Sequence, residues 1–300
     1  MYQQIASNVR RSWLLMFVFA LLIGMIAYTF ARINGMGYPG VALAVLIAIG
    51  VTWVSYWYSD KMVLSISRAK PLAKEENPYL YNIVEALAIG AGVPAPRVYV
   101  IEDTAPNAFA TGRDPRHAVI AVTTGLLQKM DRLELEGVIA HEMSHIRNRD
   151  ILLMTIAVTM AGVVTLLSDW MVRYTWRSGR ARRRDNRGGG NGAEAVILLA
   201  GLVMAILAPL FASLMQLAIS RQREYLADSS AALLTRYPKG LADALRKIAA
   251  DPEPLEVANK ATAHLYIYNP LKDSEGHMDR LFDTHPPVTE RIKRLEAMTF

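Results

Sequence analysis

The chain has 300 residues, a hydrophobic content of 52%, a mean hydropathy of +0.19 and a formal net charge of +6. It contains no cysteine, which excludes a fold held together by disulfides. The hydrophobic content is high for a soluble protein, and the apolar residues are concentrated in a few long stretches.

The first two stretches predict a transmembrane hairpin in residues 1–60. No charged residue lies between Arg11 and Arg32, or between Arg32 and Asp60. About 20 apolar residues cross the core of a bilayer as a helix, so both stretches are long enough. The start resembles a signal peptide, but no small-residue cleavage site precedes Arg32 and a second span follows at once. We therefore interpret the first stretch as a retained anchor.

Charges and aromatic residues around the hairpin predict its orientation. Aromatic residues typical of membrane interfaces occur near its ends, at Trp13, Trp53, Tyr56, Trp57 and Tyr58. Basic residues flank one side of the hairpin, at Arg10, Arg11, Lys61, Arg68, Lys70 and Lys74, with Arg32 on the other. Because cytoplasmic flanks carry the excess of basic residues, we expect the N-terminus and the segment after Lys61 to be cytoplasmic.

Residues 61–150 predict the first part of an α+β catalytic domain. Apolar spacing indicates a helix from Pro78 to Ala91, ended by Gly92. Strands are expected over residues 97–101 and 117–122, with the segment Asn107–Gly112 between them. Asp131 and Glu134 form a capping-box pattern that starts the next helix.

That next helix carries the sequence His141-Glu142-Met143-Ser144-His145. Residues four apart share one face of a helix, so the two imidazoles can hold one metal ion. Glu142 then lies beside the remaining coordination position, where it can act as a general base towards a water molecule acidified by the metal. The pattern predicts a zinc-dependent hydrolase.

Two further apolar stretches, residues 151–168 and 195–220, predict a second hydrophobic helix pair in the segment 151–220. The Arg/Gly-rich loop 173–193 separates them, with seven arginines between Arg173 and Arg187. No recognition fold accompanies this run, so we expect no nucleic-acid binding. If both stretches cross the membrane, the loop lies outside the cell, against the rule that basic loops are cytoplasmic. If the pair is re-entrant or packs on the catalytic domain, the loop can stay in the cytoplasm.

The residues after the fourth stretch offer several candidates for a third metal ligand. They are Glu224, Asp228, His264, His277 and His285. Glu224 has the best case because it lies on an amphipathic helix, Ile219 to Leu234, that begins where the fourth stretch ends. Asp228, one turn later, can accept a hydrogen bond from the far nitrogen of a ligating histidine. The competing interpretation of this pair is a solvated helix face.

Four motifs occur in an order that resembles the HtpX family of bacterial membrane-bound zinc metalloproteases, of the gluzincin type and related to CAAX-prenyl proteases. They are residues 107–112 (NAFATG), 141–150 (HEMSHIRNRD), 224–228 (EYLAD) and 284–287 (THPP) with Arg291. The resemblance covers essentially the whole chain, including its four hydrophobic stretches.

The resemblance implies a set of roles. His141, His145 and Glu224 would bind one Zn²⁺ per chain, with Glu142 as general base and proton shuttle. Asn107 and Ala108 would belong to an edge strand that pairs with the substrate backbone. His285 and Arg291 would face the site and stabilise the oxyanion.

From the motifs and the resemblance we expect a mostly helical zincin-like catalytic domain with a small sheet, plus four hydrophobic membrane-associated helices. Residues 221–300 would complete that domain with the third zinc ligand. The leading hypothesis is a multi-pass inner-membrane zinc endopeptidase that cleaves misfolded or damaged membrane proteins from the cytoplasmic side. A dedicated processing protease of lipidated or signal-like peptides, and a non-catalytic zinc-stabilised membrane scaffold, are the alternatives. The sequence leaves the oligomeric state open.

Overall fold

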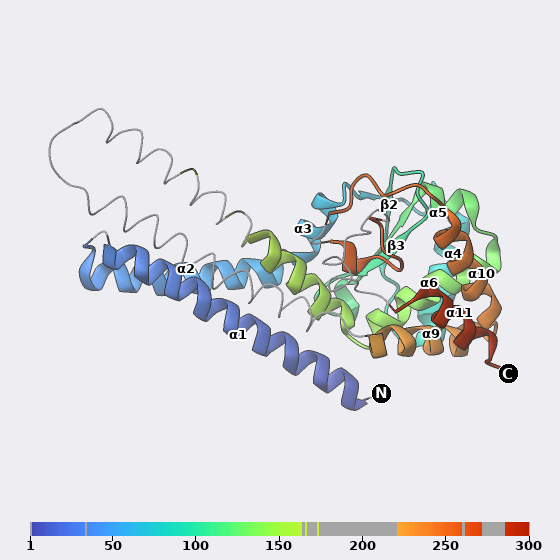
Figure 1. The fold of residues 1–300 in the computed structure, drawn as a ribbon, viewed down its shortest axis with the longest axis horizontal. Coiled ribbons are helices and arrows are strands. Elements are labelled where there is room, and N and C mark those ends of the chain that lie inside the picture. The colour runs from blue at the N-terminus through green and yellow to red at the C-terminus, as the bar shows by residue number, and fades with distance from the viewer. Residues whose placement is uncertain are drawn as a thin grey trace.

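Two long helices, α1 (Tyr2–Ile33) and α2 (Gly37–Trp57), run side by side away from a part that combines helices with a sheet (Figure 1). The computed structural model describes residues 2–33, 35–163, 166, 173, 221–259, 262–271 and 286–299. Most of the Arg/Gly-rich loop 173–193, the fourth apolar stretch, His277 and His285 lie outside the described residues.

Among the described residues, two helices are long and apolar enough to cross a membrane, rather than the four hydrophobic helices expected from the sequence. They are Ile5–Tyr28 in α1 and Gly37–Trp57 in α2. Only 33% and 22% of these segments are buried inside the protein, so most of their apolar surface faces outwards. A core helix of a soluble protein would be mostly buried, and these helices therefore agree with the predicted hairpin.

Within the described residues, the third apolar stretch forms the helix Asp150–Val163. Its residues Leu152, Leu153, Ile156 and Met160 join a buried cluster with Leu15, Met16, Phe19 and Ile23 of α1 and Ala48 of α2. This helix therefore connects the membrane hairpin to the rest of the protein through continuous apolar packing.

A mixed four-stranded sheet has the order β1-β2-β4-β3. Its strands are β1 (Lys70–Pro71), β2 (Arg97–Ile101), β3 (Ala108–Thr111) and β4 (Val119–Thr123). Strands β2 and β4 are parallel, and β1 and β3 join them as antiparallel edges. The strand expected over 117–122 begins later, because the Asp114 carboxylate accepts the N–H groups of Arg116 and His117 and holds Pro115–His117 in the 3₁₀ turn η1.

Helices surround this sheet. They are α3 (Ser59–Ile66), α4 (Pro78–Ala91), α5 (Thr124–Lys129), α6 (Arg132–Arg147), α9 (Arg221–Thr235), α10 (Pro238–Ala250) and α11 (Val288–Glu296), with the 3₁₀ turn η2 (Ala263–Leu265). Helix α4 has the predicted bounds, because Asn77 caps its start and Gly92 ends it in the left-handed conformation. The arrangement confirms a mostly helical fold with a small mixed sheet.

Helix α6 lies at the centre of the helical layer, between α4, α9 and α10. Asp131 and Glu134 form the predicted capping box at its start. It approaches α10 closely at Gly137, where an added Cβ would lie 2.6 Å from the Leu241 nitrogen. The absence of a side chain there lets two backbones meet, and this contact sets the position of α6 in the core.

Candidate metal centre and active site

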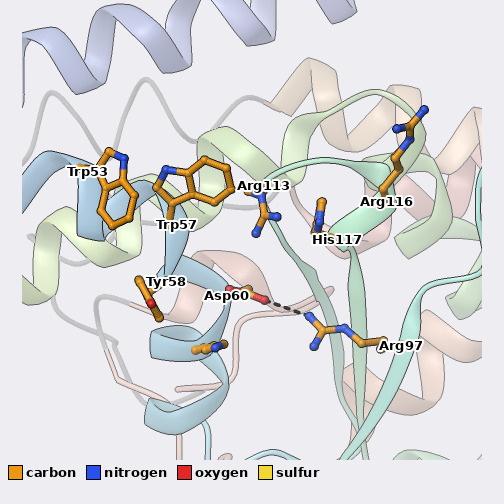
Figure 2. A pocket seen from close by; sticks show the side chains of 9 residues that line it. Trp53, Trp57, Tyr58, Asp60, Arg97, Arg113, Arg116 and His117 are labelled. Carbon is orange, nitrogen blue, oxygen red and sulfur yellow. Dashed lines mark hydrogen bonds and ion pairs between the residues drawn. The ribbon is translucent and has the colours of Figure 1, made fainter.

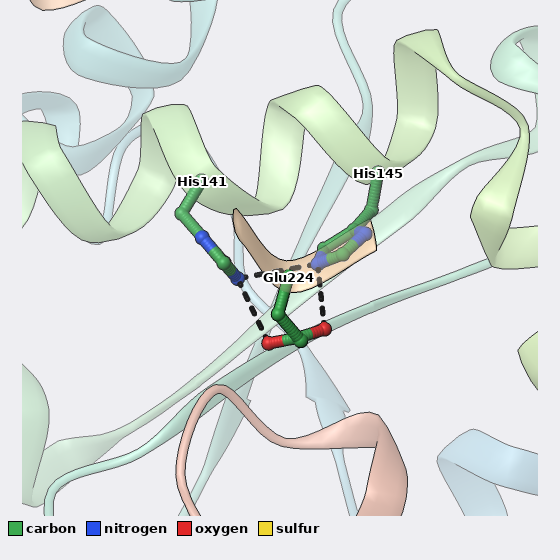
Figure 3. A group of neighbouring side chains, drawn as sticks. All are labelled: His141, His145 and Glu224. Atoms are coloured by element: carbon green, nitrogen blue, oxygen red, sulfur yellow. Dashed lines mark hydrogen bonds and ion pairs between the residues drawn. The ribbon is translucent and has the colours of Figure 1, made fainter. Parts of the chain in front are cut away.

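Helix α6 presents His141 and His145 on one face, and α9 brings Glu224 opposite them (Figure 3). The Nε2 atoms of the two histidines lie 3.2 Å apart. The Glu224 carboxylate lies 3.8 Å from Nε2 of His141 and 3.6 Å from Nε2 of His145. All three side chains are buried.

These spacings fit a single metal ion. Ligand atoms about 2.0–2.1 Å from a tetrahedral zinc lie about 3.4 Å from one another. The ligand atoms of His141, His145 and Glu224 all lie within 4.8 Å of one another. Two imidazole lone pairs that face each other at 3.2 Å, with a carboxylate beside them, need a cation or a proton between them.

A carboxylate orients each histidine from behind. Nδ1 of His141 lies 2.9 Å from the Asp228 carboxylate, and Nδ1 of His145 lies 3.1 Å from the Asp150 carboxylate. Each Nδ1–H can therefore donate to a carboxylate, which leaves Nε2 as a lone pair directed into the cluster. This arrangement fixes the tautomer and raises the basicity of a metal-binding histidine.

Asp228 is held in turn by Arg291 of α11. The Arg291 guanidinium donates to both Asp228 oxygens at 2.9 and 2.7 Å, and to the Ile267 carbonyl at 2.8 Å. Its Nη1 also lies 3.7 Å from Glu224. Burial raises the pKa of Asp228, but the adjacent Arg291 and the bond to His141 outweigh it and hold that pKa below its usual value. The carboxylate therefore stays ionised behind His141.

Asp150 is held by the membrane hairpin. Asn8 of α1 is buried and its Nδ2 donates to the Asp150 carboxylate at 2.5 Å and to the Asn148 carbonyl at 3.1 Å. Sequence reasoning assigned no role to Asn8 or Asp150. Asp150 could have been found from its place five residues after His145, whereas Asn8 could not, because 142 residues separate it from Asp150.

Glu142 lies inside the site without a full set of partners. It is buried, and no hydrogen-bond partner of its Oε1 occurs among the described residues. Burial above all, together with the charge of the nearby Glu224, raises the pKa of Glu142 to about 7, although His145, the Ala110 backbone and Arg291 act to lower it. An incompletely bonded carboxyl group with a pKa near neutrality can exchange protons at physiological pH.

The pKa of His145 depends on the same carboxylates. Burial disfavours its charged form, but the bond to Asp150 and the charges of Glu224, Asp150 and Glu142 outweigh burial and raise the pKa to about 9. A proton on His145 occupies the place that a metal ion would take. Metal binding must therefore displace a proton from this histidine.

The buried charges around the cluster leave an excess of negative charge. Four carboxylates, from Glu142, Asp150, Glu224 and Asp228, face the guanidiniums of Arg223 and Arg291. With neutral histidines the formal sum is −2, which one divalent cation would balance. The charge of the site and the spacing of its ligand atoms thus both favour one divalent metal ion.

The predicted substrate strand lies beside Glu142. Strand β3 packs against α6, and the Ala110 backbone lies close enough to lower the pKa of the Glu142 carboxyl group. The outer edge of β3 is partly covered, because the Ala108 carbonyl accepts the Ile267 N–H at 3.0 Å and Asn107 donates to the Tyr268 carbonyl at 3.1 Å. A substrate backbone that pairs with Ala108 must exchange with this bond.

Comparisons with known proteins agree with the site. The model of peptidase family M48 matches residues 74–299. The chain belongs to peptidase family M48. Two similar curated proteins are HtpX protease homologs. That of Thermoanaerobacter pseudethanolicus is 48% identical over 300 residues, which cover 100% of this chain and 98% of the relative. That of Dictyoglomus thermophilum is 47% identical over 297 residues, which cover 99% of this chain and 94% of the relative.

A solved structure supports the fold alone. The crystal structure of S. mikatae Ste24p has a TM-score of 0.52 and 19% identity, and the match covers 99% of this chain and 67% of that one. The predicted resemblance to the HtpX family is thus confirmed. The protein is a membrane metallopeptidase that uses zinc, and His141, His145 and Glu224 form a group that can hold one ion.

Proposed function

We propose that the protein is an integral inner-membrane zinc endopeptidase that hydrolyses peptide bonds in misfolded or damaged membrane proteins from the cytoplasmic side. The observation that supports this most is the His141–His145–Glu224 cluster buried next to a membrane hairpin. Membrane proteins are the substrates most easily reached by such a site. The names of the full-length relatives denote proteases, and neither alternative from the sequence gains support from them.

In this proposal His141, His145 and Glu224 hold the zinc ion. When bound, zinc supplies Lewis-acid chemistry, which polarises the scissile carbonyl and raises the acidity of a water molecule. Glu142 accepts a proton on Oε1, which has no partner among the described residues, during attack and delivers it to the leaving amine. A structural zinc site has no use for such a base, which argues against a scaffold.

The remaining predicted residues keep supporting roles. Asp228 and Asp150 position the two histidines, and Arg291 positions Asp228. Stabilisation of the oxyanion by His285 and Arg291 stays a prediction, as does substrate pairing with Asn107 and Ala108. Backbone pairing of this kind binds many sequences without selecting among them, as quality control requires.

The assignment of Glu224 is tested by Glu224→Ala. We expect the variant to lose most of its zinc, because two histidines alone do not complete a catalytic site. The matched control is Glu290→Ala on α11, which removes an exposed carboxylate that pairs with Arg294. Unchanged zinc content in Glu224→Ala would show that another residue is the third ligand.

The substrate class is tested in cells that carry either the wild type or Glu142→Gln. Proteomic comparison of membrane-protein fragments should give many products from many membrane proteins in the wild type only. One or two discrete products would instead favour the dedicated processing protease. Identical fragment sets in the two strains would contradict both proteolytic functions.

A further inference from the structure

A cavity of about 570 Å³ lies where the membrane hairpin meets the sheet-containing part of the protein (Figure 2). One wall comes from the end of α2 and the start of α3, with Trp57, Tyr58 and Lys61. The other comes from β2 and the turn after β3, with Arg97, Arg113 and Arg116. This cavity is separate from the His141–His145–Glu224 cluster, since none of those three residues lines it.

The lining of the cavity carries an excess of positive charge. Asp60 is the carboxylate of the lining, and it pairs with Arg97 at 2.9 Å. Nearby, Asp114 pairs with His117 at 2.9 Å and lies 3.7 Å from Arg113. Within the described part of the chain, no carboxylate pairs with Lys61 or Arg116, so at least these two cations are available to an anion.

Aromatic rings indicate the level in the membrane at which these cationic side chains lie. The Arg113 guanidinium lies over the Trp57 ring at 4.7 Å, and the Lys61 ammonium lies over the Tyr58 ring at 5.0 Å. Trp53 and Trp57 are 57% and 42% exposed at the end of the candidate span Gly37–Trp57. Large exposed aromatic rings at the end of a membrane helix typically lie at the level of the lipid headgroups.

Helix α1 carries a ring at the same level. Trp13 stacks on Tyr56 of α2, with ring centroids 6.1 Å apart. The two helices of the hairpin therefore present their aromatic residues together, beside the cavity. An occupant of the cavity can lie with a polar group among the cations and an apolar part along α2, whose neighbouring side chains, such as Val54, face outwards.

We propose that this cavity binds an anionic phospholipid from the leaflet on the side of the active site. Lys61, Arg113 and Arg116 would hold the phosphate and the anionic headgroup, and Trp53 and Trp57 would contact the upper acyl chains. Cationic side chains recognise phosphate through charge-assisted hydrogen bonds, and anionic lipids attract basic residues at the membrane surface. A soluble phosphate would use the cations but gain nothing from the exposed rings.

Such a lipid would fix the active site relative to the bilayer. The cavity joins α2 to the turn that directly follows β3, the strand that packs beside Glu142. A lipid bound across this junction would contact both the hairpin and the catalytic part. The inference rests on the membrane location of the protein and not on the identity of its substrates.

The test is lipid binding to the delipidated full-length protein in detergent, followed by native mass spectrometry. Dioleoyl phosphatidylglycerol should bind more tightly than dioleoyl phosphatidylcholine. In the double variant Lys61→Gln/Arg116→Gln, affinity for phosphatidylglycerol should fall by about thirty-fold, since each basic residue near a membrane surface contributes about 1 kcal/mol. Both side chains are exposed and form no ion pair with the described residues, so the variant should fold.

The matched control is Arg132→Gln/Arg246→Gln, which removes the same charge from exposed positions on α6 and α10. It should bind phosphatidylglycerol like the wild type. Equal binding of the two lipids by the wild type, or equal losses in both double variants, would overturn the proposal. Displacement of the lipid by equimolar glycerol 3-phosphate would show a soluble ligand and also overturn it.

Zinc content and casein cleavage should be unchanged in Lys61→Gln/Arg116→Gln. These readouts separate the two proposals. A wild type that binds phosphatidylglycerol selectively but cleaves nothing would contradict the proposed function and leave the lipid site standing.

Discussion

Each histidine of the candidate metal centre depends on a carboxylate that comes from outside its own helix. His141 relies on Asp228 of α9, and His145 relies on Asp150 at the start of the next helix. The pairing leaves both Nε2 atoms directed at Glu224. The same group of carboxylates makes the metal-free site unfavourable for a further negative charge, because Glu142 is buried among them and its Oε1 has no partner in the described part of the chain.

Glu142→Gln should therefore stabilise the metal-free protein, with a defined pH dependence. Burial raises the Glu142 pKa from 4.5 to about 7 in the folded protein. As the pH rises from 4.5 to 7, the unfolded chain releases this proton before the folded one, so folding stability falls. The variant has no carboxyl group at this position, so its folding stability does not fall in this way. At pH 8 the metal-free variant should be more stable by about 1–3 kcal/mol, and at pH 4.5 the difference should largely vanish.

Thermal unfolding of both proteins in detergent with a chelator measures this difference. The control is Glu136→Gln. Glu136 lies six residues before Glu142 on the same helix, but it pairs with exposed Arg132 at the surface. It should show no pH-dependent gain. A Glu142→Gln variant that is less stable than the wild type at pH 8 would refute the account of Glu142 as a buried, underbonded group.

The residues of the site differ in how far the sequence could reveal them. His141, Glu142 and His145 follow from helix periodicity, and Glu224 and Asp228 from spacing on a second helix. Arg291 was expected to face the site, but its bidentate bond to Asp228 depends on how α11 packs on α9, which no local pattern encodes. The role of Asp150 beside His145 was within reach of local spacing, whereas its bond to Asn8 was not, because the two residues are 142 positions apart.

Helix α1 acts as more than an anchor. Its Asn8 contacts the carboxylate that orients His145, and the buried cluster around Phe19 packs α1 on the helix Asp150–Val163. The membrane hairpin and the metal centre are thus linked by the hydrogen bond from Asn8 to Asp150 and by continuous packing.

Asn8→Ala should lower zinc affinity by about tenfold, the low end of the range for residues that support a metal ligand. Asn8→Asp should be worse, because it places a second carboxylate beside Asp150 although its size is unchanged. A residue important only for packing would give the opposite order. Competition with a chromogenic chelator measures the zinc affinity. The control is Thr52→Ala, whose hydroxyl donates to the Ala48 carbonyl within α2.

Gly137→Ala should destabilise the fold by about 1–3 kcal/mol, because its Cβ would meet the Leu241 backbone at 2.6 Å. The matched control is Gly50→Ala in α2, where an added Cβ would meet no atom of another described element within 4 Å. Chemical denaturation in detergent compares the two. Equal stability of Gly137→Ala and the wild type would mean that α6 and α10 shift apart without cost.

Elements with strong local signals were predicted well. Helices α4 and α6 follow from their apolar spacing and from the caps at Asn77 and Asp131. The start of β4 was wrong by two residues, because Asp114 holds the preceding turn. The order of the strands and the cover of β3 by residues 266–268 are long-range contacts, which periodicity cannot specify.

At the scale of the molecule, apolar helices and a buried metal site are joined in one chain. The hairpin exposes its apolar surface, and the N-terminus of α1 and the end of α2 both lie towards the part that carries the active site (Figure 1). This agrees with a hairpin whose two ends emerge on one side of the membrane. Composition predicted the hairpin, whereas its direct contact with the metal centre required the structure.

The most direct test compares purified full-length wild type and Glu142→Gln, each reconstituted in liposomes with a misfolded membrane-protein substrate. Zinc stoichiometry and the rate of cleavage are measured on the same samples. We predict one zinc ion per chain in both proteins and a rate at least about 10²–10⁴-fold lower in the variant. Cleavage by zinc-loaded Glu142→Gln at the wild-type rate would contradict the account.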